Sequence, residues 1–152
     1  KYLQTNNENI FAIGDISNFP FNSETGRLRL ESIQNANDQA KTVAKNVIAI
    51  RLNKQLLKYS PIPWFWSDQG DLKLQMVGIG NLNAKHHVLE NQKKGTLTVL
   101  HFVNDQLVAL DTMNHGLNHI CGRKLLSSNQ RISIENINKF EGNLKSLVNH
   151  LH

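Results

Sequence analysis

The first third of the chain pairs a short apolar run with a long stretch of helical periodicity. Residues 10–13 are all apolar and end at Gly14-Asp15, a pattern typical of a fully buried strand in a parallel sheet. A polar loop and a short strand over residues 27–30 are expected next. Apolar residues then recur every three or four positions, which predicts a long amphipathic helix with Ser32 as its N-cap: Ala36, Ala40, Val43, Ala44, Val47, Ile48 and Leu52.

The periodicity changes after residues 59–63, whose two prolines cannot continue a helix and mark the predicted domain boundary. Beyond it, Leu72, Leu74 and Met76 alternate with polar residues, which predicts a strand, and residues 86–90 predict another. Two strands are expected on either side of Asn104-Asp105, a dipeptide that favours a hairpin turn. Helices are expected over residues 118–127 and 134–151, the second with one apolar stripe: Ile137, Phe140, Leu144, Leu147 and Leu151.

The fold class that these patterns predict is α+β. Residues 59–152 are expected to form an antiparallel sheet with terminal helices, and residues 1–58 to contribute a strand and a long helix of a parallel α/β unit. The chain starts at Lys1 and leads almost at once into an apolar run, so we expect it to be a piece of something longer.

Composition and charge limit the classes of partner that the chain is expected to bind. Seventeen basic and twelve acidic residues give a net charge of +5, which favours acidic partners and raises encounter rates with them. The charge is spread along the chain, so a polybasic nucleic-acid arm is not expected. The single cysteine, Cys121, excludes an internal disulfide and favours a cytoplasmic location. No apolar run approaches the length of a membrane span, and no membrane partner is expected.

Two candidate sites lie in the first 60 residues. Gly14-Asp15 would place a carboxylate at the carboxyl edge of a sheet, where it can accept hydrogen bonds from two sugar-like hydroxyls. The start of the long helix, Glu31-Ser32-Ile33-Gln34-Asn35, offers backbone N–H groups and the positive end of the helix dipole to an electron-rich carbonyl or ring nitrogen. Alone, the first pattern also fits an ordinary turn and the second an ordinary capped helix.

The third candidate is the aromatic run Trp64-Phe65-Trp66, with Ser67 and Asp68 expected to start the following turn. These side chains can form an apolar lid against a planar cofactor, or a hydrophobic plug that joins two subdomains. The two interpretations are compatible, because one tryptophan can fill the junction while the other lines a site.

The histidines do not form a convincing metal site. His86 and His87 would point to opposite faces of a strand. His115 and His119 can share one helical face, yet only Cys121 is near enough in sequence to add a ligand. We expect solvated or capping histidines and no metal. Cys121 has no CxxC partner, so thiol redox chemistry is not supported.

Taken in order, these blocks resemble a known family. "TNNENIFAIGD", "RLESIQNANDQA", "PWFWSDQGDLKLQMVG", "VALDTMN" and "GRKLL" are similar to the carboxyl-terminal part of the FAD-dependent NADH:ferredoxin reductases of oxygenase systems, the putidaredoxin reductase-like and biphenyl dioxygenase reductase-like family. The resemblance covers nearly the whole chain. It implies that residues 1–58 are the last strand and helix of the FAD-binding domain and that residues 59–152 are the reductase C-terminal domain.

The resemblance also implies an activity and a set of site residues. Family members take hydride from NADH onto FAD and pass single electrons to an iron–sulfur ferredoxin, or to a rubredoxin, that serves an oxygenase. Gly14 and Asp15 match the motif whose carboxylate holds the ribityl hydroxyls of FAD. Ser32, Ile33 and Gln34 match the helix start below the flavin pyrimidine edge, and Glu31 matches an acidic position on the nicotinamide side. Trp66 matches an aromatic residue that approaches the flavin. No side chain here is expected to be catalytic.

The nine glycines contain no GxGxxG fingerprint, and Gly78-x-Gly80 is the nearest. We therefore expect the isolated chain to be inactive and not to retain FAD. Because residues 1–58 would lack sheet neighbours, we also expect a homodimer or a strand-exchanged arrangement. The main alternative is a non-catalytic docking or dimerisation module derived from the reductase fold, and metal binding through the histidines is a weaker one.

Overall fold

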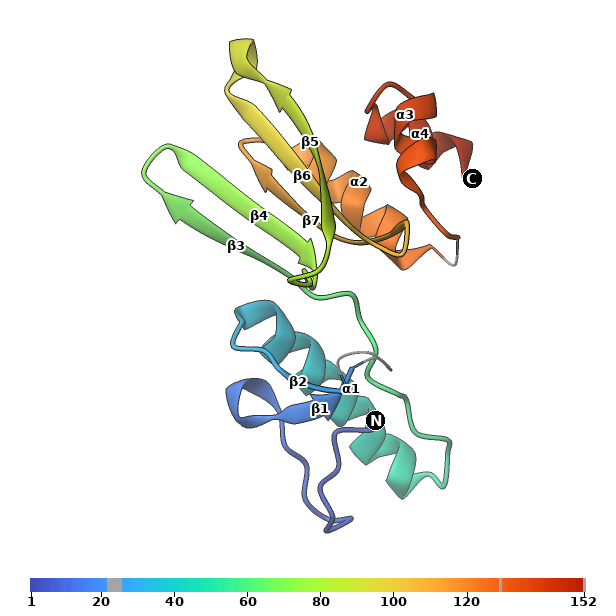
Figure 1. Cartoon of the computed structure of the whole chain (residues 1–152). Coiled ribbons are helices and arrows are strands. Elements are labelled where there is room, and N and C mark those ends of the chain that lie inside the picture. Colours follow the sequence, from blue (N-terminus) through green and yellow to red (C-terminus); the bar gives the residue numbers. More distant parts are fainter. Residues whose placement is uncertain (22–25, 129, 152) are drawn as a thin grey trace. The chain divides into compact units, whose positions relative to one another are not determined.

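The computed structural model describes residues 1–21, 26–128 and 130–151 of the 152-residue chain (Figure 1). These residues form two compact units, Lys1–Pro61 and Ile62–His152. The chain has the α+β fold that the sequence predicts, with antiparallel sheets and helices. The assignment of residues 1–58 to an FAD-binding domain and of 59–152 to a reductase C-terminal domain stays a prediction.

The first unit is built on one long helix. A 3₁₀ turn, Gly14–Ile16, leads into a two-stranded antiparallel sheet of β1 (Asn18–Pro20) and β2 (Arg27–Arg29). Helix α1 (Ile33–Arg51) follows, and the Ser32 hydroxyl accepts a hydrogen bond of 3.1 Å from the backbone N–H of Asn35. The predicted short strand, long helix and N-cap are therefore confirmed.

The predicted buried strand over residues 10–13 is wrong for this structure. Only an isolated antiparallel bridge between Gln4 and Phe11 forms there, and the side chains of Ile10 and Ile13 are 52% and 39% exposed. A strand needs hydrogen-bonding neighbours on its edges, and no parallel neighbour lies beside this segment within the described part of the chain. The apolar run is present, but the sheet that would bury it is not among these residues.

Helix α1 buries polar side chains and exposes apolar ones. Asn35, Gln39 and Asn46 are completely buried, whereas Ile48 and Leu52, which belong to the predicted apolar stripe, are exposed. Of this stripe, Val43 packs against the core of this unit, whereas Val47, Ile48 and Leu52 do not. That core is small and consists of Leu3, Phe19 and Tyr59, with Phe11, Phe21, Leu28, Leu30 and Val43 packed around it.

The second unit contains one antiparallel sheet with the strand order β3-β4-β7-β6-β5. Its strands are β3 (Trp64–Gln69), β4 (Leu72–Gly78), β5 (Lys85–Asn91), β6 (Thr96–Val103) and β7 (Gln106–Met113). A 3₁₀ turn, Gln92–Lys94, joins β5 to β6. Asn104 and Asp105 both have positive φ angles, 49° and 57°, as a type I′ hairpin turn requires. The predicted strands and this hairpin are confirmed.

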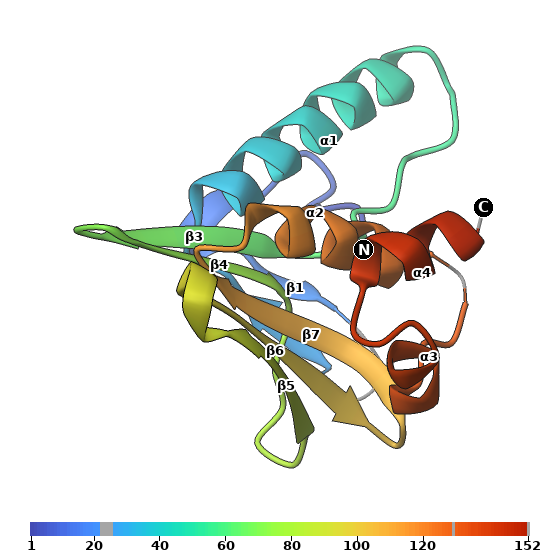
Figure 2. The same ribbon diagram turned by 90° about the horizontal axis from the view of Figure 1, so that it is seen from above.

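Helices α2 (Gly116–Ser127) and α4 (Leu144–His150) lie on one face of this sheet, and α3 (Ile134–Lys139) lies between them in sequence (Figure 2). The core between sheet and helices is apolar and fully enclosed, and includes Val77, Leu100, Phe102, Leu110, Leu125 and Leu147. The alternating Leu72 and Leu74 of β4 are on the opposite, exposed face, so Val77 is the side chain that this strand contributes to the core.

The single helical segment predicted over residues 134–151 is in fact two helices. Glu141 and Gly142 have φ angles of 51° and 75°, and left-handed residues cannot continue an α-helix. Asn143 then caps α4 by accepting a hydrogen bond of 3.0 Å from the backbone N–H of Ser146. The predicted apolar stripe nevertheless packs on the core, because the break turns both short helices toward the sheet.

Candidate functional site

The Gly14-Asp15 turn packs against the first half of α1. The backbone N–H of Gly14 donates a buried hydrogen bond of 2.7 Å to the side-chain oxygen of Gln39. Gly14 has a φ angle of 70°, which favours glycine, and a Cβ there would lie 3.7 Å from the Cβ of Ala36. Asp15 follows with an exposed side chain. The first unit thus brings the predicted carboxylate and the predicted helix start into one region.

The start of α1 combines a side-chain cap with the positive end of a helix dipole. Ser32 caps it, the side chain of Ile33 is 68% exposed, and the Gln34 side chain donates to the carboxylate of Asp38 one turn later. The first N–H groups of a helix have no acceptor within the helix, and the dipole adds positive potential there. Glu31 lies just before the cap and forms a 2.7 Å ion pair with Arg29.

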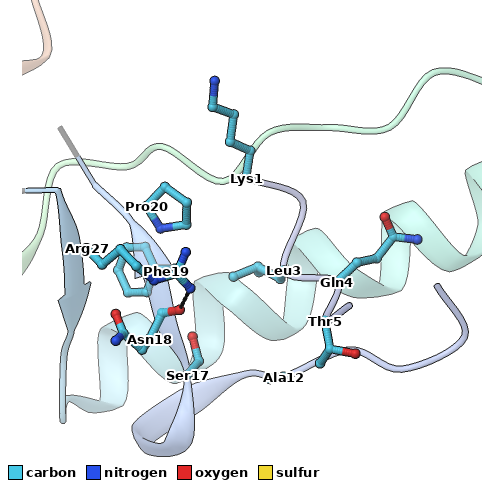
Figure 3. A pocket seen from close by; sticks show the side chains of 10 residues that line it. All are labelled: Lys1, Leu3, Gln4, Thr5, Ala12, Ser17, Asn18, Phe19, Pro20 and Arg27. Carbon is cyan, nitrogen blue, oxygen red and sulfur yellow. Dashed lines mark hydrogen bonds between the residues drawn. The ribbon is translucent and has the colours of Figure 1, made fainter. Parts of the chain in front are cut away.

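A separate pocket of about 260 Å³ is lined in part by residues of β1 and β2 (Figure 3). Ala12, Ser17, Phe19 and Arg27 are among its lining residues, whereas Asp15 and Ser32 are not. The Arg27 guanidinium donates to the backbone carbonyl of Asn18 and so adds a link between β2 and β1. This pocket therefore does not coincide with the predicted cofactor-binding residues.

In the second unit, β3 presents its aromatic residues on two faces of the sheet. Trp64 and Trp66 lie on the helix-covered face and stack with ring centroids 5.7 Å apart and 28° between the ring planes. Phe65 points to the opposite face, as the alternation of a strand requires. Ser67 and Asp68 are strand residues and do not start the turn as predicted, because β3 continues to Gln69 and the turn is Gly70-Asp71.

The stacked tryptophans are supported from helix α2. The guanidinium carbon of Arg123 lies 4.4 Å from the ring centroid of Trp64, a cation–π contact. The buried ring of His119 meets Trp64 edge-on, with 5.7 Å between ring centroids. Burial first, and the charge of Arg123 second, lower the pKa of His119 below its usual 6.5. His119 is therefore neutral at physiological pH.

The buried His119 predicts a pH-dependent stability. Its pKa is lower in the folded chain than in the unfolded chain, so its contribution is fully present above the unfolded value of 6.5. That contribution is lost as the pH falls through the folded pKa. Urea unfolding at pH 8 and at pH 5 is expected to show a smaller loss of unfolding free energy in His119→Gln than in the wild type. His86→Gln, at an exposed histidine, serves as the control. An equal change in unfolding free energy between pH 8 and pH 5 in the two variants would contradict the prediction.

A hollow of about 360 Å³ lies beside the two indoles, lined by Trp64, Trp66, Asp68, Lys73 and Gln75. These residues alternate along β3 and β4 and therefore share one face. Trp66 is 44% exposed and has the larger free ring surface. Since Trp66 belongs to the second unit and Asp15 to the first, their approach to one cofactor stays a prediction.

Three further histidines, His86, His101 and His115, have structural partners. His115 caps α2 by accepting from the Asn118 backbone N–H at 3.3 Å, which confirms the expectation of a capping role. His101 hydrogen-bonds Asp111 at 2.8 Å and meets the ring of His86 edge-on. No cluster of three metal-ligating side chains occurs among the residues described. Sequence reasoning missed Gln39, His119 and Arg123, which reach the candidate residues through contacts distant in the chain.

Comparison with known proteins identifies the family. The chain belongs to the reductase C-terminal family, whose model matches residues 64–148. It is 34% identical over 148 residues to rhodocoxin reductase of Rhodococcus erythropolis, a match that covers 97% of this chain and 34% of the relative. It is 32% identical over 149 residues to a 5,5'-dehydrodivanillate O-demethylase ferredoxin reductase subunit of a Sphingobium species, covering 97% and 35%.

Solved structures agree with these relatives. The ferredoxin reductase for the CYP199A2 system from Rhodopseudomonas palustris matches with a TM-score of 0.81 at 31% identity, covering 97% of this chain and 35% of that one. The covalent putidaredoxin reductase–putidaredoxin complex also matches with a TM-score of 0.81, at 25% identity and coverages of 99% and 35%. The chain thus spans about a third of the length of the relatives it matches. The resemblance to ferredoxin reductases is confirmed.

None of the helices in the described ranges is both long and apolar enough to span a bilayer. The cytoplasmic location stays a prediction.

Proposed function

We propose that this chain is the carboxyl-terminal part of an FAD-dependent ferredoxin–NAD reductase. The full-length protein would move electrons from NADH through FAD to an iron–sulfur ferredoxin, or to a rubredoxin, that serves an oxygenase. The relatives named above are ferredoxin reductases, and one matching structure is a complex with putidaredoxin. On its own, the chain is expected to be inactive. The homodimer or strand-exchanged arrangement stays a prediction.

The observation that carries the proposal is the packing of the Gly14-Asp15 turn on the start of α1. Asp15 supplies exposed carboxylate oxygens, which suit the hydroxyls of a ribityl chain. The Ser32-capped helix start supplies backbone donors and a positive potential, which suit the electron-rich edge of a flavin. The exposed side chains of Ile16 and Ile33 add apolar surface. The residues present therefore fit the cofactor that the family implies.

When bound, FAD supplies the hydride and single-electron chemistry, and the side chains of this chain bind and orient. In this proposal Gly14 and Asp15 hold the ribityl chain, and Ser32, Ile33 and Gln34 present the helix start to the pyrimidine edge. Glu31 lies on the nicotinamide side, although its ion pair with Arg29 ties it to β2. Trp66, which stacks on Trp64, is the aromatic residue that would approach the flavin in the full-length protein. The net charge of +5 favours an acidic electron acceptor.

The decisive experiment compares Asp15→Ala with the wild type in the full-length protein. The wild type is expected to purify with bound flavin and to reduce a ferredoxin at the expense of NADH. Hydrogen bonds to charged groups contribute about 1.5–3 kcal/mol each, so Asp15→Ala is expected to weaken FAD binding at least about tenfold. The measurement is the flavin-to-protein ratio after dialysis, together with the FAD dissociation constant by fluorescence titration.

Glu8→Ala provides the matched control, because Glu8 is an exposed carboxylate in the same unit, outside the candidate site. It is expected to retain FAD like the wild type. A wild-type protein that takes up no flavin but self-associates would favour the docking or dimerisation module instead.

A further inference from the structure

Helix α1 carries a buried chain of amide side chains that ends at the proposed cofactor turn. Asn35 and Gln39 have 0% exposed surface, although both side chains are polar. Tyr59, from the segment after the helix, donates its hydroxyl proton to the side-chain oxygen of Asn35 at 2.9 Å. The Gln39 side-chain nitrogen donates to the same oxygen at 3.2 Å, and its own oxygen accepts from the Gly14 N–H at 2.7 Å.

The donors and acceptors of this side-chain network are fixed by the groups at its two ends. The backbone carbonyl of Leu30 is an acceptor, so the Asn35 side chain must present its NH₂ group to it, at 2.9 Å. The Asn35 oxygen then faces Gln39, which must present its own NH₂ group in turn. The Gln39 oxygen is thereby left pointing at Gly14, whose backbone N–H can only donate. The Leu30 carbonyl and the Gly14 N–H therefore require the same orientation of the two amide groups.

Apolar side chains on this helix face would stabilise the core more than buried amides do. An apolar helix face would bury against the core without desolvating amides, and a partly satisfied polar network is worse than none. Here, however, the buried Gly14 N–H needs an acceptor, because its left-handed turn leaves it pointing at the helix. Gln39 supplies that acceptor at a fixed position and so determines where the next residue, Asp15, stands.

We propose that Gln39, oriented by Asn35 and Tyr59, is a positioning residue that aims the Gly14-Asp15 turn at the cofactor. This inference rests on the proposed function, and Gln39 itself touches no cofactor in it. Gln39 lies 25 residues from Gly14 in sequence and makes the direct hydrogen bond between the helix and the turn. The turn's conformation is then a property of the folded chain before any cofactor binds.

The test is Gln39→Leu, which keeps the approximate side-chain volume and removes both hydrogen bonds. The buried Gly14 N–H then has no acceptor, which favours turn conformations that expose it to water. We therefore expect FAD binding by the full-length protein to weaken about tenfold. Independently of cofactor, the Gly14 amide in the 152-residue chain is expected to exchange its hydrogen at least about tenfold faster, measured by NMR.

Asn46→Leu is the matched control. Asn46 is another fully buried amide of α1, but it holds the backbone of Tyr2 and Leu57 and does not contact the turn. It is expected to lose stability without a change in FAD affinity, measured at a temperature where both variants are folded. Gln39→Glu guards against misfolding of Gln39→Leu. In this fully buried place the neutral acid form is favoured, which keeps an oxygen facing Gly14 and donates its O–H to the Asn35 oxygen, so the variant is expected to lose FAD affinity less severely.

The outcomes separate the two proposals. If the wild type binds FAD and both Gln39 variants match it, or if Asn46→Leu loses FAD as strongly as Gln39→Leu, the positioning role is refuted and the proposed function stands. If the wild type binds no FAD at all, both are refuted. Faster Gly14 exchange together with weaker FAD binding in Gln39→Leu alone supports the role.

Discussion

Replacing Gly122 with alanine is expected to destabilise the second unit by about 3 kcal/mol, because helix α2 lies directly on strand β7 at this residue. A Cβ at Gly122 would lie 1.8 Å from Cδ2 and 2.7 Å from Cγ of Leu110. Leu110 is fully buried in the core and cannot move aside into solvent. The helix must therefore shift away from the sheet, and the packing of the whole layer loosens.

Urea unfolding followed by tryptophan fluorescence measures this effect well, since both tryptophans belong to the second unit. Gly116→Ala is the matched control in the same helix. Its Cβ would meet only the Gln75 side-chain oxygen, at an ordinary 3.6 Å, and alanine favours helix over glycine by up to about 1 kcal/mol. Equal unfolding midpoints for Gly122→Ala and the wild type would show that the helix tolerates displacement.

The elements of the second unit were predictable because their signals are local. Two-residue alternation indicates a strand, and Asn104-Asp105 is favoured where two successive residues need positive φ angles. The break at Glu141-Gly142 also has a local signal, a glycine followed by a capping asparagine. It was missed because the apolar stripe runs through it at helical spacing.

The first unit was harder to predict, because many of its patterned apolar side chains are not buried by any described residue. Residues 10–13 have the composition of a buried strand, yet composition cannot provide the neighbouring strands that a sheet requires. Likewise the sequence has the apolar stripe of α1, but most of its large side chains are exposed here, and the fully buried side chains of the helix are Asn35, Gln39 and Asn46. Periodicity reveals which side chains share a face, and not which face the rest of the protein covers.

The candidate site shows the same division. Ser32 was predicted as an N-cap from its own neighbourhood, and the structure confirms it. Gln39 and Arg123 were not, because the first acts on a turn 25 residues earlier and the second on a ring in another element. Contacts of that kind depend on how the elements pack, and a single sequence carries no direct record of them.

Gly78 fits two roles in the sequence, part of a nucleotide-binding pattern or a residue at a close strand contact. With Gly80 it gives the nearest approach in this chain to a dinucleotide-binding fingerprint. In the structure, Gly78 ends strand β4 with a φ angle of 78° and pairs with Ala109 of β7. A Cβ there would lie 2.2 Å from the backbone oxygen of Val108. The glycine is therefore required by close strand packing.

Gly78→Ala is accordingly expected to lower the unfolding free energy by about 3–4 kcal/mol, from left-handed strain of about 1–2 kcal/mol plus the clash with a backbone atom that cannot rotate away. Gly78 also donates its backbone N–H to the Pro63 carbonyl at 2.8 Å, directly before Trp64. The tryptophan emission of the folded variant should therefore change as well. Gly80→Ala is the control, because its Cβ would meet only the His101 ring at 3.6 Å. If both alanines were equally mild, the glycine at position 78 would not be a packing requirement, and the start of β3 at Trp64 would have to be held by other contacts.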